Sequence, residues 1–183
     1  MSEKMLIQHC SPTLAGLKTG SLFSCFFASE RKMRESLRHF NRRLSKKGLR
    51  VLPVRYREHR ALIYVYRPTQ LARDLEMGEV QQILRPRGYV CEHPWQCVSK
   101  LMTRLKESED FPHEIGLFLG YPPEDVHGFI ENKPNACKCV GTWKVYGDEN
   151  RARALFAKYK KCTGVYTKQW ENGRTIERLT VTG

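Results

Sequence analysis

The sequence predicts an α/β or α+β protein, a single domain over residues 1–183 with a mixed sheet of about six to seven strands and flanking helices. Helical and strand-like segments alternate along the chain, and two places have the pattern of a hairpin. No internal repeat or low-complexity linker divides the sequence, and 183 residues is an ordinary length for one domain.

The first expected helix is short and begins at a proline. Ser11 and Pro12 have the pattern of an N-cap followed by the first helical residue, and the helix is expected to end near Gly20. The apolar run SLFSCFF comes next and has the length of a strand.

A charged helix and a hairpin follow. Residues 30–47 carry one apolar stripe on an otherwise charged helix, which Gly48 closes. Residues 49–68 are expected to form two strands joined at Glu58 and His59, and Pro53 places the first strand at an edge or at a bulge. The stripe consists of Met33, Leu37, Phe40 and Leu44.

Helices are expected through the middle of the chain. Thr69 caps one helix, Gly78 separates it from a short second turn, and Pro94 opens a stronger helix. The nearly continuous apolar run 115–119 is expected to be a strand buried on both faces. The segment PPEDVHGFIE then starts a helix with proline and acids in its first turn.

The C-terminal part is expected to alternate between strand and helix. The segment VGTWKVYG reads as a strand, and a helix capped by Asp148 runs through DENRARALFAKYKKC. The segments GVYTKQW and TIERLTV are expected to pair as a closing hairpin around Glu171, Asn172 and Gly173.

The chain is strongly basic, with a net charge of +13. Residues 30–60 hold twelve Lys and Arg against three Glu, which favours an anionic partner: nucleic acid, an acidic protein or a phosphorylated ligand. The basic helix 30–47 would carry such an interaction, although no known nucleic-acid motif accompanies it. A well-solvated surface is the alternative. The exposed face would include Arg31, Arg34, Arg38, Arg42 and Lys46.

The sequence predicts a soluble cytoplasmic protein with no membrane partner. The N-terminus lacks the apolar core of a signal peptide, and no apolar run approaches the roughly 20 residues that span a bilayer. Seven cysteines is an odd number for a disulfide scaffold, so reduced thiols, metal ligands or reactive groups are expected. Simple burial is the alternative for most of them.

Cys10 is the candidate nucleophile. It would stand just before the start of a helix, where free backbone N–H groups favour a thiolate. His9 is adjacent and should point away from it, so His113 is the better candidate base, with Glu114 to orient the imidazole. Alternatively, Cys10 is a buried filler and His113 a capping or hydrogen-bonding group.

A ligand site is expected at the segment LGYPPED. Ligands of open α/β sheets bind where strands end and helices begin, although acids in a first helical turn also stabilise the helix itself. The acid Asp125 could stabilise charge there, and Lys18 and Lys144 would attract an anionic substrate. Trp143 could add a stacking surface or simply pack in the core. The candidate ligand-binding residues are Thr13, Lys18, Gly120, Tyr121, Asp125, Trp143 and Lys144.

A zinc or iron–sulfur site is a further possibility. The segments CEHPWQC and CKC could together supply four ligands, although the usual C-x2-C spacing is absent. Burial of free thiols is the alternative. The candidate ligands are Cys91, His93, Cys97, Cys137 and Cys139.

Three blocks of sequence carry a resemblance to a known family: HCSPTLAGLKTGSLF, FPHEIGLFLGYPPEDVHGFI and WKVYGD. They resemble an uncharacterised bacterial family, a domain of unknown function common in anaerobes, and the resemblance covers essentially the whole chain. It implies no activity, cofactor or catalytic residue. It does imply that a shared site lies among these blocks rather than on the basic helix.

Three functions follow as hypotheses. The leading one is a thiol-dependent enzyme of hydrolase or transferase type that acts on a small anionic ligand in a cleft between Cys10 and His113. The second is a non-enzymatic module that binds nucleic acid or an acidic protein through residues 30–60. The third is a Cys/His metal protein. The sequence names no cofactor and leaves open whether the protein is an enzyme.

Overall fold

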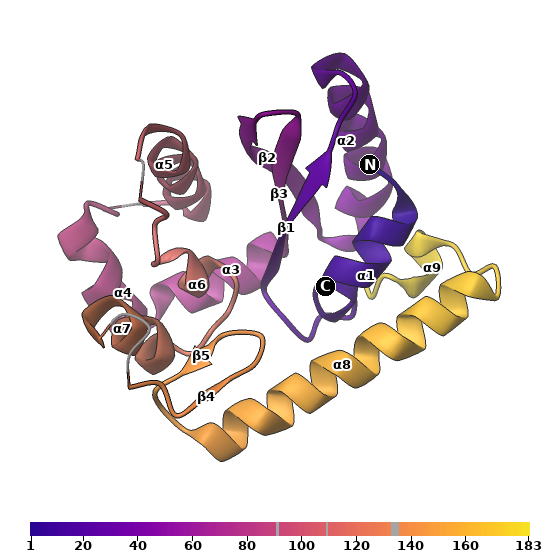
Figure 1. Cartoon of the computed structure of the whole chain (residues 1–183). Helices are drawn as coiled ribbons and strands as arrows, with labels where there is room; N and C mark the ends of the chain where they lie inside the picture. The colour runs from indigo at the N-terminus through magenta and orange to yellow at the C-terminus, as the bar shows by residue number, and fades with distance from the viewer. Residues whose placement is uncertain (91, 109, 133–135) are drawn as a thin grey trace. The chain divides into compact units, whose positions relative to one another are not determined.

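A computed structural model of the chain describes residues 1–90, 92–108, 110–132 and 136–183 (Figure 1). The chain divides into two compact units, one made of Met1–Gln70 with Lys161–Gly183 and the other of Leu71–Lys160. The boundaries fall inside helices α3 (Pro68–Glu76) and α8 (Glu149–Glu171). The single domain expected for residues 1–183 stays a prediction.

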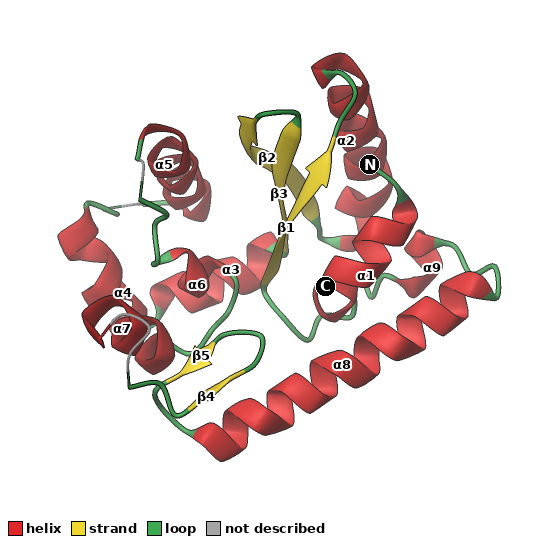
Figure 2. Ribbon diagram, viewed as in Figure 1, coloured by secondary structure: helices red, strands yellow, loops and turns green. Residues whose placement is uncertain are grey.

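The first unit is built on an antiparallel sheet of three strands in the order β1-β3-β2 (Figure 2). The strands are β1 (Gly20–Phe26), β2 (Arg50–Arg57) and β3 (Arg60–Tyr66). Glu58 and His59 have positive φ angles of 47° and 61°, which a two-residue hairpin turn requires and which confirms the predicted turn. Pro53 lies on edge strand β2 at a register shift, as its missing N–H predicts.

Helices α1 (Glu3–Leu14) and α2 (Glu30–Leu44) pack their apolar residues against one face of this sheet. The predicted stripe of α2 is buried as expected, and the Ser29 side chain accepts a hydrogen bond from the Lys32 N–H at the helix start. The short helix α9 (Ile176–Leu179) completes this core. Arg43 of α2 forms ion pairs with Glu3 of α1 and Glu177 of α9.

A buried arginine fastens the C-terminal end of α1 in the first unit. Arg67 is 4% exposed, and its guanidinium donates to the carbonyl oxygens of Thr13, Leu14 and Val181, each at 2.7 Å. The last carbonyls of a helix lack partners within the helix, so a cation at this end satisfies them and also opposes the helix dipole. Burial lowers the pKa of Arg67. One side chain thus connects strand β3, helix α1 and the C-terminal segment.

The second unit is mostly helical (Figure 1). Its buried apolar residues come chiefly from its helices, and a short hairpin lies beside α7. In addition to parts of α3 and α8, its elements are α4 (Gly78–Leu84), α5 (Pro94–Glu107), α6 (Ile115–Phe118), α7 (Pro123–Asn132), β4 (Cys139–Val140) and β5 (Lys144–Val145). Single-turn 3-10 helices follow α2 and α4, at Ser45–Lys47 and Arg85–Arg87.

The expected sheet of six to seven strands is wrong. In the described part of the chain, the strands form the three-stranded sheet and the two-stranded hairpin, so the protein is α+β. The apolar run 115–119 is mostly helix α6, because four consecutive buried residues fit one helical turn as well as a strand. The expected C-terminal hairpin is also helical: α8 continues to Glu171, and Gly173 with a φ of 84° follows its end.

The first helix also begins elsewhere than expected. Helix α1 starts at Glu3, so Ser11 and Pro12 lie inside its C-terminal part instead of capping it. Leu6, Ile7 and Leu14 are fully buried on its inner face, and this spacing sets the helix. The Ser11 hydroxyl donates to the carbonyl of Ile7 within the helix. No helix in the described part of the chain combines the length and the apolar character needed to cross a membrane.

Candidate functional site

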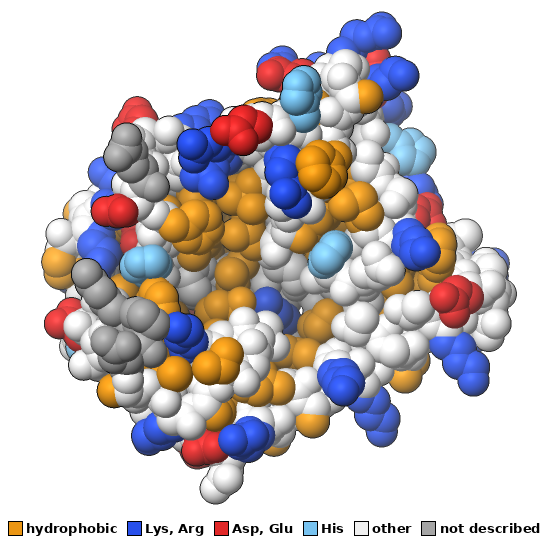
Figure 3. All heavy atoms as spheres, viewed as in Figure 1, with side chains coloured by type: hydrophobic (Ala, Val, Ile, Leu, Met, Phe, Trp, Pro, Cys, Tyr) orange, Lys and Arg blue, Asp and Glu red, His pale blue; other side chains and the backbone are white. Residues whose placement is uncertain are grey.

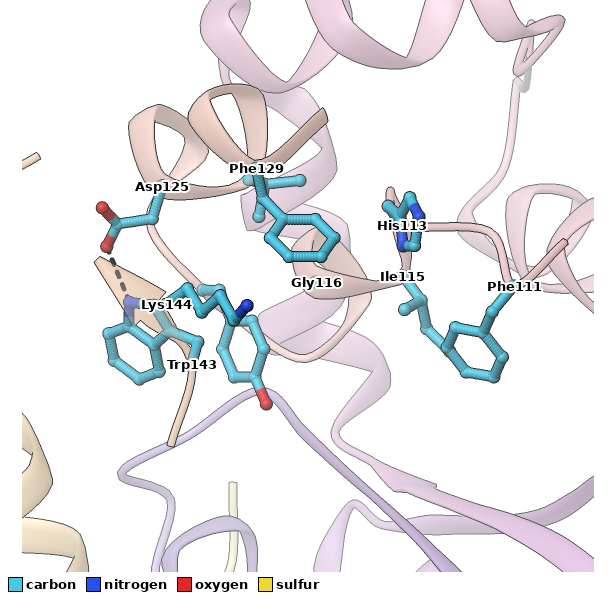
Figure 4. A pocket seen from close by; sticks show the side chains of 10 residues that line it. Phe111, His113, Ile115, Gly116, Asp125, Phe129, Trp143 and Lys144 are labelled. Carbon is cyan, nitrogen blue, oxygen red and sulfur yellow. Dashed lines mark hydrogen bonds between the residues drawn. The ribbon is translucent and has the colours of Figure 1, made fainter. Parts of the chain in front are cut away.

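A cavity of about 200 Å³ lies in the second unit, among the segment before α6, helices α6 and α7, and strand β5 (Figure 4). Its walls are mainly aromatic, and two basic side chains, His113 and Lys144, also reach it. Ligand pockets are typically apolar with a few polar groups that fix orientation. The aromatic rings are those of Phe111, Tyr121, Phe129 and Trp143.

Asp125 holds one wall of the cavity together. It is 3% exposed, and its carboxylate accepts hydrogen bonds from the Trp143 Nε1–H at 2.6 Å and from the N–H groups of Tyr146 and Gly147 at 2.7 Å (Figure 4). These bonds join α7 to the residues just before and just after β5. Because three donors already occupy this carboxylate, its role is to position Trp143 rather than to receive a ligand.

Tyr121 and Trp143 form a stacked pair at the same wall, with ring centroids 4.8 Å apart and planes 28° apart. The Tyr121 hydroxyl donates to the carbonyl of Thr142 at 3.4 Å. Burial, with a smaller contribution from Tyr159, raises the pKa of Tyr121 to about 12, so the phenol stays neutral near pH 7. Trp143 also meets Phe156 edge-on at 4.5 Å. The pair therefore gives the cavity a rigid, uncharged aromatic wall.

Lys144 and His113 both approach a third aromatic ring of the cavity, that of Phe129. The Lys144 Nζ lies 5.7 Å from the centre of the Phe129 ring and points toward it in Figure 4. The exposed His113 imidazole meets the same ring nearly edge-on, at 4.8 Å. Lys144 forms no ion pair with any described residue. Its ammonium is therefore a cation available at an aromatic cavity.

Two glycines shape the short helix behind the cavity. Gly116 lies so close to α7 that an added Cβ would stand 2.7 Å from a Val126 methyl carbon and 3.1 Å from the Tyr121 ring. Gly120 has a φ of 73° and follows α6, where the left-handed conformation favours glycine. Gly120 thus turns the chain so that Tyr121 reaches the cavity.

The structure gives the Glu114 carboxylate partners other than His113. This carboxylate is 3% exposed, forms an ion pair with the Arg104 Nε at 2.8 Å and accepts a hydrogen bond from the Tyr89 hydroxyl at 3.0 Å. Burial and the nearby Glu114 carboxylate both raise the pKa of Tyr89. Glu114 therefore connects α6 to α5, beside the cavity rather than inside it.

The remaining expected residues belong to the first unit, whereas the cavity belongs to the second. Cys10 is fully buried in the core inside α1, and Lys18 is 8% exposed. Thr13 is also fully buried, and its hydroxyl lies 2.8 Å from that of Ser21. Burial raises the pKa of Cys10 to about 12 and lowers that of Lys18 to about 8, and each shift is partly opposed by the charge of the other group. The helix start that was to activate Cys10 lies seven residues away, at Glu3.

Cys10 is therefore expected to resist alkylation in the folded protein. At pH 8 a thiol with a pKa near 12 holds about a thousandfold less thiolate than a free cysteine, and burial also blocks access. Peptide mapping after iodoacetamide treatment measures this directly, with the half-exposed Cys137 and Cys139 as internal references. Unfolding in urea should remove the protection. A Cys10 that reacts as fast as free cysteine in the folded protein would restore the nucleophile hypothesis.

The expected metal ligands do not form a metal site within the described residues, where no three His, Cys, Asp or Glu side chains gather around a common point. Cys97 is buried in α5 and disulfide-bonded, so its sulfur is not a thiolate ligand. The exposed His93 precedes α5, and its backbone N–H donates to the Gln96 side chain at 3.0 Å. Cys137 and Cys139 are half-exposed free thiols, and Cys91 lies outside the described residues.

Half of the residues that line the cavity were singled out from the sequence, and the other half were not. The structure brings together His113, Tyr121, Asp125, Trp143 and Lys144, as the sequence blocks suggested. It adds Phe111, Ile115, Gly116, Val126 and Phe129. Phe129 follows Asp125 by four residues, so the helical period of the expected helix 122–131 already placed both on one face. No comparable sequence signal marked Phe111.

Comparison with known protein families identifies a match over most of the chain. Residues 6–180 match the model of a family described as a protein of unknown function (DUF3793). No curated protein and no solved structure matches the chain.

Proposed function

We propose that this chain, which belongs to the DUF3793 family, binds a small anionic ligand with one flat ring in the cavity of its second unit. The observation that carries the proposal is the pairing of an aromatic cavity with the Lys144 ammonium, which has no ion-pair partner among the described residues. The ring would lie between aromatic walls, and the anionic group would face Lys144 and His113.

The size of the cavity limits the ligand. Pockets for drug-sized molecules hold roughly 300–1,000 Å³, whereas a cavity of about 150 Å³ holds benzene. The cavity of about 200 Å³ therefore suits a single ring with one small substituent. Larger ligands would have to extend past the exposed His113.

The charge around the cavity favours an anion over a cation. Three hydrogen bonds hold the Asp125 carboxylate, and Glu114 is paired with Arg104 outside the cavity. The remaining charged lining group is Lys144. A carboxylate or phosphate close to this ammonium gains between about 1 and 4 kcal/mol, depending on how far water is excluded.

Benzoate and benzyl alcohol test the proposal as a matched pair of probes, one anionic and one neutral. We expect benzoate to shift the NMR signal of the Trp143 indole N–H, which lies in the cavity wall. The substitution Lys144→Ala should weaken benzoate about tenfold and leave benzyl alcohol nearly unchanged, because only the anion loses its partner. Lys158→Ala removes an exposed lysine of α8 outside the cavity and serves as the control.

Two outcomes would contradict the proposal. If neither probe moves the Trp143 signal, the cavity does not take a ring of this size. If benzoate binds equally well before and after Lys144→Ala, the ligand is not selected by its charge.

Catalysis by Cys10 is not part of this proposal. The buried thiol has a raised pKa, and the cavity residues lie in the other unit. The thiol-dependent reaction expected from the sequence stays a prediction, and the alkylation experiment on Cys10 tests it independently of ligand binding.

A further inference from the structure

The net positive charge of the protein comes entirely from its first unit. Met1–Gln70 and Lys161–Gly183 hold 19 Lys and Arg against 6 Asp and Glu, a net charge of +13. Leu71–Lys160 hold 13 of each and are neutral. The candidate ligand cavity in the neutral unit therefore does not use this charge, which is available for a second interaction of the basic unit.

The sheet of the first unit has two unlike faces. The core face, covered by α1 and α2, carries Phe23, Cys25, Ala61 and Ile63. Because side chains alternate along a strand, the neighbouring Phe26 points to the opposite face, which we call the outer face. At the hairpin end of the outer face, the register places Phe26, Arg60 and Arg57 side by side on adjacent strands.

An exposed ring paired with an arginine lies at this end of the outer face. Phe26 is 71% exposed, the most exposed phenylalanine in the described part of the chain. The Arg60 guanidinium carbon lies 4.4 Å from the centre of the ring, and the Arg60 Nε donates to the Ser24 hydroxyl at 3.2 Å. The ring and the guanidinium are thus held against each other while most of the ring faces solvent.

The charges around this pair are also accessible. Arg57 pairs with the adjacent Glu58 at 3.6 Å, but both side chains are largely exposed, and such surface pairs contribute only about 0–1 kcal/mol. Figure 3 shows Lys and Arg side chains beside hydrophobic ones over α2 and the nearby strand ends.

We propose that the hairpin end of the outer face binds single-stranded nucleic acid, with a base stacked on Phe26 and with Arg57 and Arg60 on the neighbouring phosphates. An aromatic ring can stack on any unpaired base, whereas the stacked bases of a duplex are not accessible to it. Arginine contributes both phosphate contacts and stacking on a base. The charge of the unit complements a polyanion, and the exposed ring distinguishes this surface from a merely solvated one.

Fluorescence anisotropy with a labelled 20-nucleotide single strand of mixed sequence tests the proposal, in parallel RNA and DNA arms and against the duplex of the same sequence. We expect the full chain to bind the single strands more tightly than the duplex and to lose affinity as salt rises. Phe26→Ala should weaken single-strand binding about tenfold or more and leave duplex binding unchanged. Arg60→Ala should lower the salt slope by about one.

Matched variants separate stacking from charge and from folding. Phe26→Leu keeps an apolar side chain without the ring and should bind like Phe26→Ala. Trp95→Ala removes an exposed aromatic ring, 64% exposed, from the neutral unit and should bind like the unmodified chain. Because Phe26 is exposed, its variants should unfold at the same urea concentration as the unmodified chain, and this measurement verifies that they fold.

Three results would overturn the proposal. Equal single-strand binding before and after Phe26→Ala would show that no base stacks there. Equal affinity for single strands, the duplex and poly-glutamate would indicate a general surface for polyanions or acidic proteins. If the chain binds no single strand even at low salt, the positive charge of the first unit does not serve to bind nucleic acid. None of these results bears on benzoate binding in the second unit.

Discussion

Replacing Arg67 by lysine should destabilise the first unit by about 2–4 kcal/mol. The guanidinium donates to three carbonyl oxygens from two separate segments, and the single ammonium of lysine cannot reach all three. The substitution keeps the charge, so it isolates the geometry of the donor. The buried charge would remain while some of its hydrogen bonds are lost, and a buried charge with too few partners is costly. Urea unfolding monitored by circular dichroism measures the change in the free energy of unfolding.

The control for this prediction is Arg50→Lys, at an exposed position of strand β2. It should change the free energy of unfolding by no more than about 0.5 kcal/mol. If Arg67→Lys is as stable as the unmodified chain, Arg67 does not fasten α1 and the C-terminal segment. Arg67→Met removes the buried charge together with the three hydrogen bonds. Comparing its free energy of unfolding with that of Arg67→Lys separates the effect of the buried charge from the effect of the lost hydrogen bonds.

Replacing Asp125 by alanine should cost about 3–5 kcal/mol in the second unit and abolish benzoate binding there. The substitution leaves three donors without their acceptor, the Trp143 Nε1–H and two backbone N–H groups, and each unsatisfied buried donor costs about 1–3 kcal/mol. Loss of these bonds also frees Trp143 from the cavity wall. The Trp143 indole NMR signal should therefore shift or broaden in the absence of any ligand.

Asp125→Asn and Glu131→Ala complete this experiment. The asparagine keeps the shape and one acceptor oxygen, so an intermediate loss of stability is expected. Glu131 is an exposed acid of the same helix, and its removal should change stability by no more than about 0.5 kcal/mol. If Asp125→Ala keeps both the stability and the Trp143 signal, the carboxylate does not organise the cavity.

The two units differ in how far the sequence predicted them. Helix α2 and the β2-β3 hairpin were predictable, because a regular apolar stripe and a turn between two strand-like runs are local signals. Helix α6 was not, because Ile115–Phe118 is short and apolar throughout, and such a run fits either a strand or a helix. The length of α8 was missed because Thr163, Val165, Tyr166 and Thr167 are residues that favour strands.

The candidate site was also predicted only in part from the sequence. The sequence pointed to the blocks around His113, Tyr121 and Trp143, and these residues do line one cavity. It did not indicate the partners of Glu114, Tyr89 and Arg104, which are 25 and 10 residues away along the chain. The exposed ring of Phe26 was hidden within an apolar run, because only the strand register shows which side chains face outward.

The sequence by itself determined the composition-level and local properties of this protein: its net charge, the basic residues 30–60, the stripe of α2 and the turn at Glu58 and His59. Tertiary structure alone decided that Cys10 is buried with a raised pKa, that Arg67 joins three segments and that Asp125 organises an aromatic cavity. The physical reason is that burial and hydrogen bonding depend on residues distant in the chain. Periodicity and propensity report only on neighbours within a few residues.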